Sequence, residues 1–585
     1  MMLAMPGPDT RGANLERLER ETFDLCIIGG GITGAGVALD AASRGLSVAL
    51  VDKGDFASGT SSKSSKMIHG GLRYLAQYEF GLTWEASRER DLLRRIAPHL
   101  VRPLRFLFPA YRKGIQTRFA TLGLSVYDVL AAGRGFGRHR RAGDADIRML
   151  APTLDPKRVV GAWTYWDAST DDARLVFEVL RTAHGSGAAI ANYSRVDGFD
   201  FAGGRIFAAN VVEETTGREF PIRARCFLNA GGVWADQVGR LSPGGAPPPL
   251  RPAKGIHLVV PLTTLPVGCG VVIPSVARDG RSMFVVPWSG NAVIGTTDTE
   301  FDGPLDQPSV NTEDVEYMLS AVNWSLGVDV SPTDVVAAWA GLRPLRAGAG
   351  GPDTRTADLS RKHHLSVSSA GLVSITGGKL TTYRRMAVEA VDLVCSRLGA
   401  RGRSSTRRLP IGLARPLAGV TEETVNAAAH MDVGEDVAHH LVQTYGDRAP
   451  QVLALAAEDE GLAEPIVPGL PWLAAEAVWA VRHEMAVTLG DVLERRTRLS
   501  LSDRHAGLLS DAPALVAREA AWAPEQLASE IRSVRDRISA ERGPVASLGD
   551  RLDPARSPGS SPLGPEAATR ADRGGEESPS SRMNR

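Results

Sequence analysis

The sequence predicts an α/β protein that carries a helical domain towards its C-terminal end. From residue 21 to about residue 400, short β-branched runs such as FDLCIIGG, LSVALVDK and NAVIGTTD alternate with segments of helical spacing. This alternation is typical of α/β proteins. Between about residues 405 and 540, strand signals are scarce, and alanine, leucine, glutamate and arginine recur at helical spacing, as in AAEAVWAVRHEMAVTLGDVLERRTRL. That spacing indicates a helical domain.

The chain of 585 residues is long enough for several domains. We divide it into a flexible leader at 1–20, an α/β region at 21–400, a helical C-terminal domain at 401–542 and a tail at 543–585. The tail contains too few large apolar residues to pack, so we expect it to be disordered.

The composition argues against several classes of function. The 67 basic and 67 acidic residues give a net charge of zero, so bulk charge does not suggest a nucleic-acid partner. The four cysteines are widely spaced and form no zinc-ligand pattern; they fit a reducing cytosol, with Cys26 buried in an apolar run. The sequence HEMAV at 483–487 lacks the second histidine of a zinc-protease helix, so we predict no metal site. No apolar run is long enough for a signal peptide or a membrane span, so we expect a cytoplasmic protein.

A dinucleotide site is predicted at the first strand–turn–helix unit. The apolar run Phe23–Ile28 leads directly into Gly29-x-Gly31-x-x-Gly34, a helical segment follows, and a second apolar run ends in Asp52. Gly29 allows the tight turn, Gly31 allows the backbone to approach a pyrophosphate, and Gly34 allows the helix to pack closely on the strand. The helix N-terminus favours phosphate, and Asp52 is placed to accept hydrogen bonds from ribose hydroxyls. A simple glycine turn is the alternative, but the complete context favours the dinucleotide.

A second motif follows at residues 58–75, which read SGTSSKSSKMIHGGLRYL. A nicotinamide-binding domain would normally continue with its next strand at this point. Here a polar loop is present instead, and it is able to run beneath a long, flat cofactor. A serine-rich surface linker is the alternative, although such linkers rarely carry His, Arg and Tyr so close to glycines.

With these two motifs the sequence closely resembles the FAD-dependent glycerol-3-phosphate dehydrogenases of the D-amino-acid-oxidase-like superfamily. The resemblance runs from about residue 22 to about residue 540. It rests on IIGGGITGAG, GTSSKSSKMIHGGLRYL, DDARLV, NAGGVWAD, KGIHLVVP, IGTTDTE, GLRPL and GGKLTTYR, which follow one another in this order.

The resemblance implies a Rossmann-like, glutathione-reductase-like FAD-binding domain with an inserted mixed β-sheet substrate domain, followed by an all-helical domain. The FAD-binding segments would be 21–80, 155–235 and 335–400, and the substrate-domain segments 81–154 and 236–334. FAD would be held non-covalently. Its binding residues would be Gly29, Gly31, Gly34, Asp52, Thr60, Ser61, Ser64, Ser65, Ala230, Trp234, Leu380 and Thr381. Gly231 departs from the threonine common in the family, which removes one hydroxyl from the expected contacts.

The resemblance also implies oxidation of sn-glycerol 3-phosphate to dihydroxyacetone phosphate by hydride transfer from C2 to flavin N5. Arg73, Tyr74 and Lys379 match the expected phosphate and substrate clamp, and Arg343 would be a further cation near the reacting carbon. An arginine fork and a lysine charge both suit a phosphate.

The general base stays open between two histidines. His69 and His257 both have suitable ordinary pKa values, and Arg343 is the alternative through stabilisation of the alkoxide. Asp171, Asp172 and Arg174 match a family motif, but a structural ion-pair network explains them at least as well as catalysis.

The electron acceptor implied by the resemblance is membrane quinone, reached by peripheral attachment to the cytoplasmic membrane. Between Arg88 and Arg141 the chain has thirteen Lys/Arg against three Asp/Glu, interleaved with apolar segments. Such a surface suits an anionic lipid bilayer, and a solvated basic face is the alternative. Competing functions are a glycerol-3-phosphate oxidase that makes hydrogen peroxide, another FAD amine or 2-hydroxyacid oxidoreductase, and a flavin sensor without turnover. For the C-terminal helices we expect packing or homodimer formation.

Overall fold

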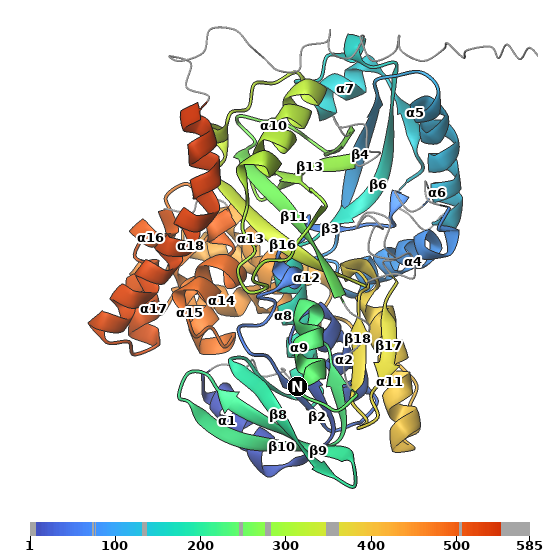
Figure 1. The fold of residues 1–585 in the computed structure, drawn as a ribbon. Helices are drawn as coiled ribbons and strands as arrows, with labels where there is room; N and C mark the ends of the chain where they lie inside the picture. The colour runs from blue at the N-terminus through green and yellow to red at the C-terminus, as the bar shows by residue number, and fades with distance from the viewer. Residues whose placement is uncertain are drawn as a thin grey trace, which may run out of the picture.

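The computed structural model describes residues 8–72, 75, 78–131, 137–244, 250–274, 282–346, 362–501 and 506–551. Within these residues two β-sheets lie one above the other in the view of Figure 1, and a group of helices lies to one side of them. The α/β class with a helical C-terminal region, predicted from the sequence, is confirmed.

The first sheet is a mainly parallel sheet that contains the dinucleotide motif. Its central strand β1 pairs in parallel with β10 on one side and with β2 on the other. The strand order is β17 (His364–Val367), β18 (Val373–Thr376), β10 (Arg218–Asn229), β1 (Thr22–Ile28), β2 (Val48–Val51) and β7 (Ala189–Ala191), with β8 (Ser194–Ala202) and β9 (Arg205–Glu213) continuing from β10.

Strand β1 is buried on both faces, which explains why its sequence is continuously apolar. Leu25 and Ile27 face one core, which includes the helices α2 (Ile32–Ser43), α8 (Asp172–Gly185) and α11 (Tyr383–Leu398). Phe23 and Cys26 face the other core. The predicted buried packing of Cys26 is therefore confirmed.

The second sheet is mixed and mostly antiparallel. Its order is β15 (Thr299–Glu300), β11 (Leu250–Pro261), β14 (Asn291–Gly295), β13 (Ser282–Trp288), β12 (Gly270–Pro274), β4 (Arg102–Ala110), β6 (Gly161–Ser169) and β3 (Met67–Ile68), with β16 (Ala337–Arg346) on β11 and β5 (Arg140–Ala142) on β6. Both β6 and β16 fall within the ranges that the sequence assigned to FAD-binding segments, so those boundaries do not coincide with the sheets.

Helices surround both sheets. Besides α2, α8 and α11, the helices before the C-terminal domain are α1 (Pro8–Arg20), α4 (Phe80–Ile96), α5 (Ile115–Arg118), α6 (Leu124–Leu130), α7 (Asp144–Leu150), α9 (Ala235–Arg240) and α10 (Thr312–Leu326). The C-terminal helices are α12 (Leu417–His430), α13 (Glu435–Tyr445), α14 (Ala449–Ala456), α15 (Ala474–His483), α16 (Ala506–Leu509), α17 (Ala512–Glu519) and α18 (Pro524–Arg551).

Two terminal predictions are wrong for the residues that the structure describes. Residues 8–20 of the expected flexible leader form α1, whose Leu18 is buried in the second core of the first sheet and whose Arg11 pairs with Glu213 at 2.7 Å. Residues 543–551 of the expected disordered tail belong to α18, and Val545 and Leu548 are buried in the core of the second sheet. Residues 552–585 lie outside the described residues.

Candidate active site

The glycine cradle, defined here as Gly29, Gly31 and Gly34, lies between β1 and α2. A Cβ on Gly29 would lie 2.6 Å from the carbonyl oxygen of Ala230, and a Cβ on Gly34 would lie 1.8 Å from that of Gly29. Gly29 also has a φ of 113°, which side-chain-bearing residues rarely adopt. The tight turn at Gly29 and the close packing at Gly34 are confirmed, and the approach of Gly31 to a pyrophosphate stays a prediction.

The N-terminus of α2 is open for an anion. Its N-cap, Gly31, provides no side-chain cap, and no acidic residue lies in the first turn. A helix start without an N-cap side chain and without an acidic residue in its first turn favours phosphate.

Asp52 follows β2 and reaches back to the cradle. Its carboxylate accepts hydrogen bonds from the backbone N–H of Gly30 at 2.6 Å and of Gly54 at 2.9 Å. Burial raises the pKa of Asp52 to about 6, against the two backbone hydrogen bonds, which lower it. Asp52 thus stabilises the turn that carries the cradle, and its expected contact with ribose remains a prediction.

The serine-rich loop, residues 58–66, connects the cradle to the second sheet. Ser61 Oγ accepts a hydrogen bond from the N–H of Ile32 at 2.9 Å, at the start of α2. Thr60 Oγ1 donates to the carbonyl of Leu342 in β16 at 2.6 Å. Ser64 Oγ accepts from the N–H of Lys66 at 3.2 Å. The hydroxyls of this loop therefore fix its course between the two sheets.

His257 is the predicted base that lies next to this loop. Its Nε2 is 2.8 Å from Ser65 Oγ, and its ring stacks on Trp339 with centroids 4.9 Å apart. Burial, with the charges of Lys66 and Arg343, lowers the pKa of His257 well below 6.5, so its imidazole is neutral at neutral pH. Gly295 makes room for the ring, because a Cβ there would lie 2.1 Å from His257 Cδ2.

Arg343 extends from β16 across β11. Its Nη2 donates to Thr296 Oγ1 at 3.0 Å and to the carbonyl of Thr297 at 3.1 Å. Gly255 is needed on the neighbouring strand, since a Cβ there would lie 2.4 Å from Nη2. The Arg343 side chain remains 22% exposed, so its guanidinium is oriented by the protein and still reaches solvent.

The segment GGKLTTYR, residues 377–384, contacts the backbone of His69. Thr381, in the short helix Leu380–Thr382, accepts a hydrogen bond from the N–H of His69 at 3.2 Å and donates to its carbonyl at 3.3 Å. Lys379 directly precedes this helix and is half-buried. The structure therefore brings His69, Lys379, Leu380 and Thr381 to one place.

The motif NAGGVWAD, residues 229–236, lies against the cradle and the serine-rich loop. Ala230 is the residue that Gly29 approaches, and its N–H donates to the carbonyl of Ile28 at 2.8 Å. The indole of Trp234 borders Gly59, where a Cβ would lie 2.8 Å from the ring. Arg73 and Tyr74, predicted for substrate binding, lie outside the described residues.

The cradle and its neighbours fit FAD. The helix start, whose N-cap Gly31 has no side chain, and the glycine approaches suit the pyrophosphate, as described above. In addition, the indole Nε1 of Trp234 is buried and has no hydrogen-bond partner among the described residues. A buried donor of this kind calls for an acceptor, which a bound cofactor can provide.

Several residues beside the site escaped the sequence analysis. Asp55 accepts hydrogen bonds from Arg495 and Arg496 at 2.5 Å, and the two arginines outweigh burial and hold its pKa at about 2. Lys66 pairs with Asp172 at 2.7 Å. The basic run RRTR at 495–498 can be seen in the sequence. However, Asp55 and Asp172, to which these arginines bind, lie more than 300 residues away. Asp171, Asp172 and Arg174 do belong to an ion-pair network, with Arg174 bound to Glu484 at 2.7 Å.

Comparison with known proteins agrees with this geometry. Residues 24–384 match the family of FAD dependent oxidoreductases, and residues 404–527 match the family described as the C-terminal domain of alpha-glycerophosphate oxidase. Fold and site together define an FAD-dependent oxidoreductase of this class.

The similar proteins narrow the class further. The glycerol-3-phosphate dehydrogenase of Mycobacterium leprae is 38% identical over 540 residues, covering 92% of this chain and 91% of that protein. The aerobic glycerol-3-phosphate dehydrogenase of Staphylococcus saprophyticus is 35% identical over 494 residues, covering 82% and 87%. A crystal structure of the glycerol-3-phosphate dehydrogenase of Bacillus halodurans with FAD is 29% identical, with a TM-score of 0.76 over 92% of this chain and 99% of that chain. The chain belongs to the FAD-dependent glycerol-3-phosphate dehydrogenase family, as its motifs predicted.

None of the helices in the described residues combines the length and apolar character required to cross a bilayer. Over the same ranges, no three His, Cys, Asp or Glu side chains are grouped so that they could hold a metal ion.

Proposed function

We propose that this chain oxidises sn-glycerol 3-phosphate to dihydroxyacetone phosphate with non-covalently bound FAD, and that the electrons pass to membrane quinone. The observation that supports it most strongly is that His257 and Arg343 lie beside the serine-rich loop, in a chain that is 38% identical to a named glycerol-3-phosphate dehydrogenase over 540 residues. When bound, FAD accepts the hydride from C2 at its N5 atom.

The cations of the site would hold the substrate phosphate. Arg343 offers a planar guanidinium whose orientation is fixed by Thr296 and Thr297. Lys379 adds a compact charge, and Arg73 with Tyr74 completes the proposed clamp. A phosphate dianion gains most from forked, charge-assisted hydrogen bonds of this kind.

His257 is our first choice for the group that takes the proton of the C2 hydroxyl. A neutral imidazole can accept that proton at Nε2, through Ser65 Oγ at 2.8 Å. His69 is the second choice, and Arg343 stabilises a developing alkoxide in either case.

Anaerobic titration of the purified holoenzyme tests this function. Adding sn-glycerol 3-phosphate should bleach the flavin absorbance, while glycerol and 2-hydroxyacids should leave it unchanged. A flavin that stays oxidised with every substrate would favour a sensor without turnover, and bleaching by amines or 2-hydroxyacids alone would favour another FAD oxidoreductase.

We further propose peripheral attachment to the cytoplasmic membrane through a lipid surface on α4, α5 and α6. These three helices lie together along one side of the molecule in Figure 1. Tyr78, Phe80, Trp84, Leu122 and Val129 are exposed apolar residues on or beside them, and Arg95, Arg112, Lys113 and Arg118 are exposed cations. Apolar groups with surrounding cations suit anionic lipid. Other cations of the basic stretch serve the fold; Arg90, for example, is buried against Asp167 at 2.6 Å.

Vesicle co-sedimentation tests this surface. Binding should be stronger to anionic than to neutral vesicles and should fall in a Trp84→Ser, Leu122→Ser double variant that keeps its FAD. Equal sedimentation of the double variant and the unaltered chain would remove this surface from the proposal.

A glycerol-3-phosphate oxidase is the second candidate, because residues 404–527 match a family named after such an oxidase. Measuring hydrogen peroxide yield against quinone reduction under air separates the two. The C-terminal helices also remain our candidate for a homodimer contact, supported by Leu509, which is 84% exposed on α16. Light scattering of the holoenzyme checks the oligomeric state.

A further inference from the structure

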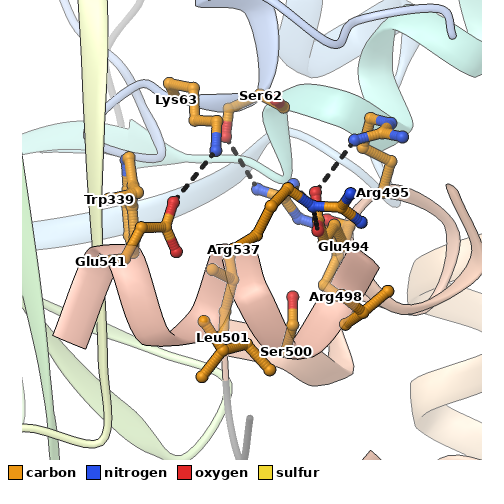
Figure 2. A pocket seen from close by; sticks show the side chains of 12 residues that line it. Ser62, Lys63, Trp339, Glu494, Arg495, Arg498, Ser500, Leu501, Arg537 and Glu541 are labelled. Atoms are coloured by element: carbon orange, nitrogen blue, oxygen red, sulfur yellow. Dashed lines mark hydrogen bonds and ion pairs between the residues drawn. The ribbon is translucent and has the colours of Figure 1, made fainter. Parts of the chain in front are cut away.

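The helical C-terminal domain contacts the serine-rich loop through the side chain of Arg498. Arg498 Nη2 donates to the carbonyl of Ser62 at 3.2 Å and to Asp172 Oδ1 at 2.9 Å. Figure 2 shows Arg498 together with Ser62 and Lys63. A residue of the C-terminal domain is therefore in direct contact with the loop that the family places beside the flavin.

Asp172, at the start of α8, gathers further contacts from the same loop. It accepts hydrogen bonds from Lys66 Nζ at 2.7 Å and from the backbone N–H of Ser64 at 2.9 Å. Lys66 Nζ also donates to the carbonyl of Ser62 at 2.8 Å. We call Lys66, Asp172 and Arg498 the charge clamp; together they fix the backbone of residues 62, 64 and 66.

The charge clamp is buried. Lys66 and Asp172 are 0% exposed and the side chain of Arg498 is 4% exposed. Asp171 lies 3.5 Å from Arg498 Nε, so two cations face two carboxylates. Such a group is stable only while every member is present, because a lone buried charge is strongly unfavourable.

Both cations of the clamp have an unusual backbone. Lys66 has a φ of 57° and Arg498 a φ of 64°, in the left-handed region that residues with side chains rarely occupy. Outliers of this kind persist where the surrounding structure imposes them and are common at functional sites. Here both side chains converge on Asp172 and the carbonyl of Ser62.

The back of the loop faces a small recess. About 30 Å³ of space lies between Ser62, Lys63 and the helix α18. Figure 2 shows the ion pairs across it: Lys63 to Glu541 at 3.9 Å and Arg537 to Glu494 at 2.9 Å. Polar contacts to the C-terminal domain therefore line this side of the loop, together with the apolar side chains of Trp339 and Leu501.

We infer that Arg498 is a positioning residue for the reaction: through the charge clamp it holds the serine-rich loop so that Ser65 presents its hydroxyl to His257. Ser65 lies between Ser64 and Lys66, both of which the clamp fixes, and its Oγ is 2.8 Å from His257 Nε2. This inference rests on the proposed function and assigns part of the active site to the C-terminal domain.

Anaerobic stopped-flow reduction of the holoenzyme by sn-glycerol 3-phosphate tests the inference. In Arg498→Met, the limiting rate constant for flavin reduction should fall at least tenfold, while the Kd for the substrate changes less than threefold, because the phosphate clamp is untouched. Arg498→Lys keeps the charge but loses the fork, and its rate constant should lie between the two. In the FAD-free protein, the amide of Ser64 should exchange with deuterium at least tenfold faster in Arg498→Met.

The matched control is Arg482→Met, which removes ion pairs to Glu519 and Glu458, both within the C-terminal domain. Its rate constant and its Ser64 exchange should stay within twofold of the unaltered chain. A rate constant for Arg498→Met within twofold of the unaltered chain would overturn the inference. If Arg498→Met does not fold, Arg498→Lys decides by the same criterion. Failure of the unaltered chain to bleach would instead overturn the proposed function.

Discussion

The glycine cradle and the charge clamp hold neighbouring parts of one loop by opposite means. At the cradle, missing side chains let backbone approach backbone, and Ser61 bonds to the start of α2. At the clamp, fully buried charged side chains from three distant segments meet around Ser62 and Ser64. The first arrangement fails when an atom is added, whereas the second fails when a charge is removed.

The largest effect is expected from filling the cradle. Alanine at position 34 would gain about 1 kcal/mol of helix propensity over glycine, but its Cβ would lie 1.8 Å from the carbonyl oxygen of Gly29. We expect Gly34→Ala to lose about 3 kcal/mol or more of stability in this region and most of its bound FAD, measured by absorbance after desalting. Gly419→Ala in α12 is the control: no atom lies within 4 Å of that Cβ, so FAD content should be unchanged. Full FAD content in Gly34→Ala would contradict the cradle.

The second-largest effect is expected from removing a carboxylate of the charge clamp. Asp172→Asn leaves Lys66 and Arg498 as buried cations with one carboxylate fewer, which should lower the free energy of unfolding by about 3–5 kcal/mol. Urea denaturation of the FAD-free protein measures it. Glu21→Gln, which removes a surface pair whose carboxylate side chain is 46% exposed, should change stability by less than about 1 kcal/mol. Similar losses in both variants would show that the clamp has no special role.

The stability of the two regions should also depend on pH over different pH ranges. The pKa of Asp52 is raised to about 6, so the folded state binds the proton more tightly and stability falls as pH rises from about 4 to 6. Burial lowers the pKa of Lys66 to about 8, so the unfolded state binds the proton more tightly and stability rises as pH increases from about 8 to 10. Each change should be about 3 kcal/mol at most.

Thermal unfolding of the FAD-free protein across these pH values measures both trends. Asp52→Asn should flatten only the acidic window, and Lys66→Met only the alkaline one. A single variant that flattens both windows would show that the regions are coupled more tightly than their separate contacts suggest.

A smaller effect is expected just beyond the loop. Arg73→Ala should lose at least about 2 kcal/mol of substrate or transition-state binding, as expected for a charge-assisted contact, while FAD content stays near normal. Steady-state kinetics with sn-glycerol 3-phosphate measures it, and an unaltered kcat/KM would remove Arg73 from the site.

The smallest effect is expected from a partly exposed pair in the C-terminal domain. Arg482 pairs with Glu519 at 2.7 Å, and its side chain is 38% exposed. Solvent screens such a pair, so Arg482→Met should lower stability by less than about 1 kcal/mol in the same urea experiment. A loss as large as that of Asp172→Asn would remove the distinction between buried and surface charges.

The cradle could be predicted from the sequence because its determinants are local. Gly29, Gly31 and Gly34 act on backbone within a few residues, so their spacing alone indicates the geometry. The family motifs named Ser65, Thr381, His69 and His257 as site candidates without pairing them; the structure adds that Ser65 contacts His257 and that Thr381 contacts His69.

The clamp could not be predicted, because Arg498 and Asp172 are 326 residues apart and neither lies in a pattern that names its partner. Strand pairing is equally non-local, which is why the expected segment boundaries do not coincide with the two sheets. The burial of Leu18 could not be predicted from α1, because that sequence is short and mostly polar. Leu18 packs on a sheet whose strands come later in the chain.

Helix α18 has a consequence for the order in which the protein can be completed during synthesis. Val545 and Leu548 fill part of the core of the second sheet, whose strands are all translated before them. Chains emerge from the ribosome from the N-terminus onwards, so this core keeps an apolar opening until nearly the whole molecule has been made. The core of the second sheet can therefore be completed only after α18 has been translated.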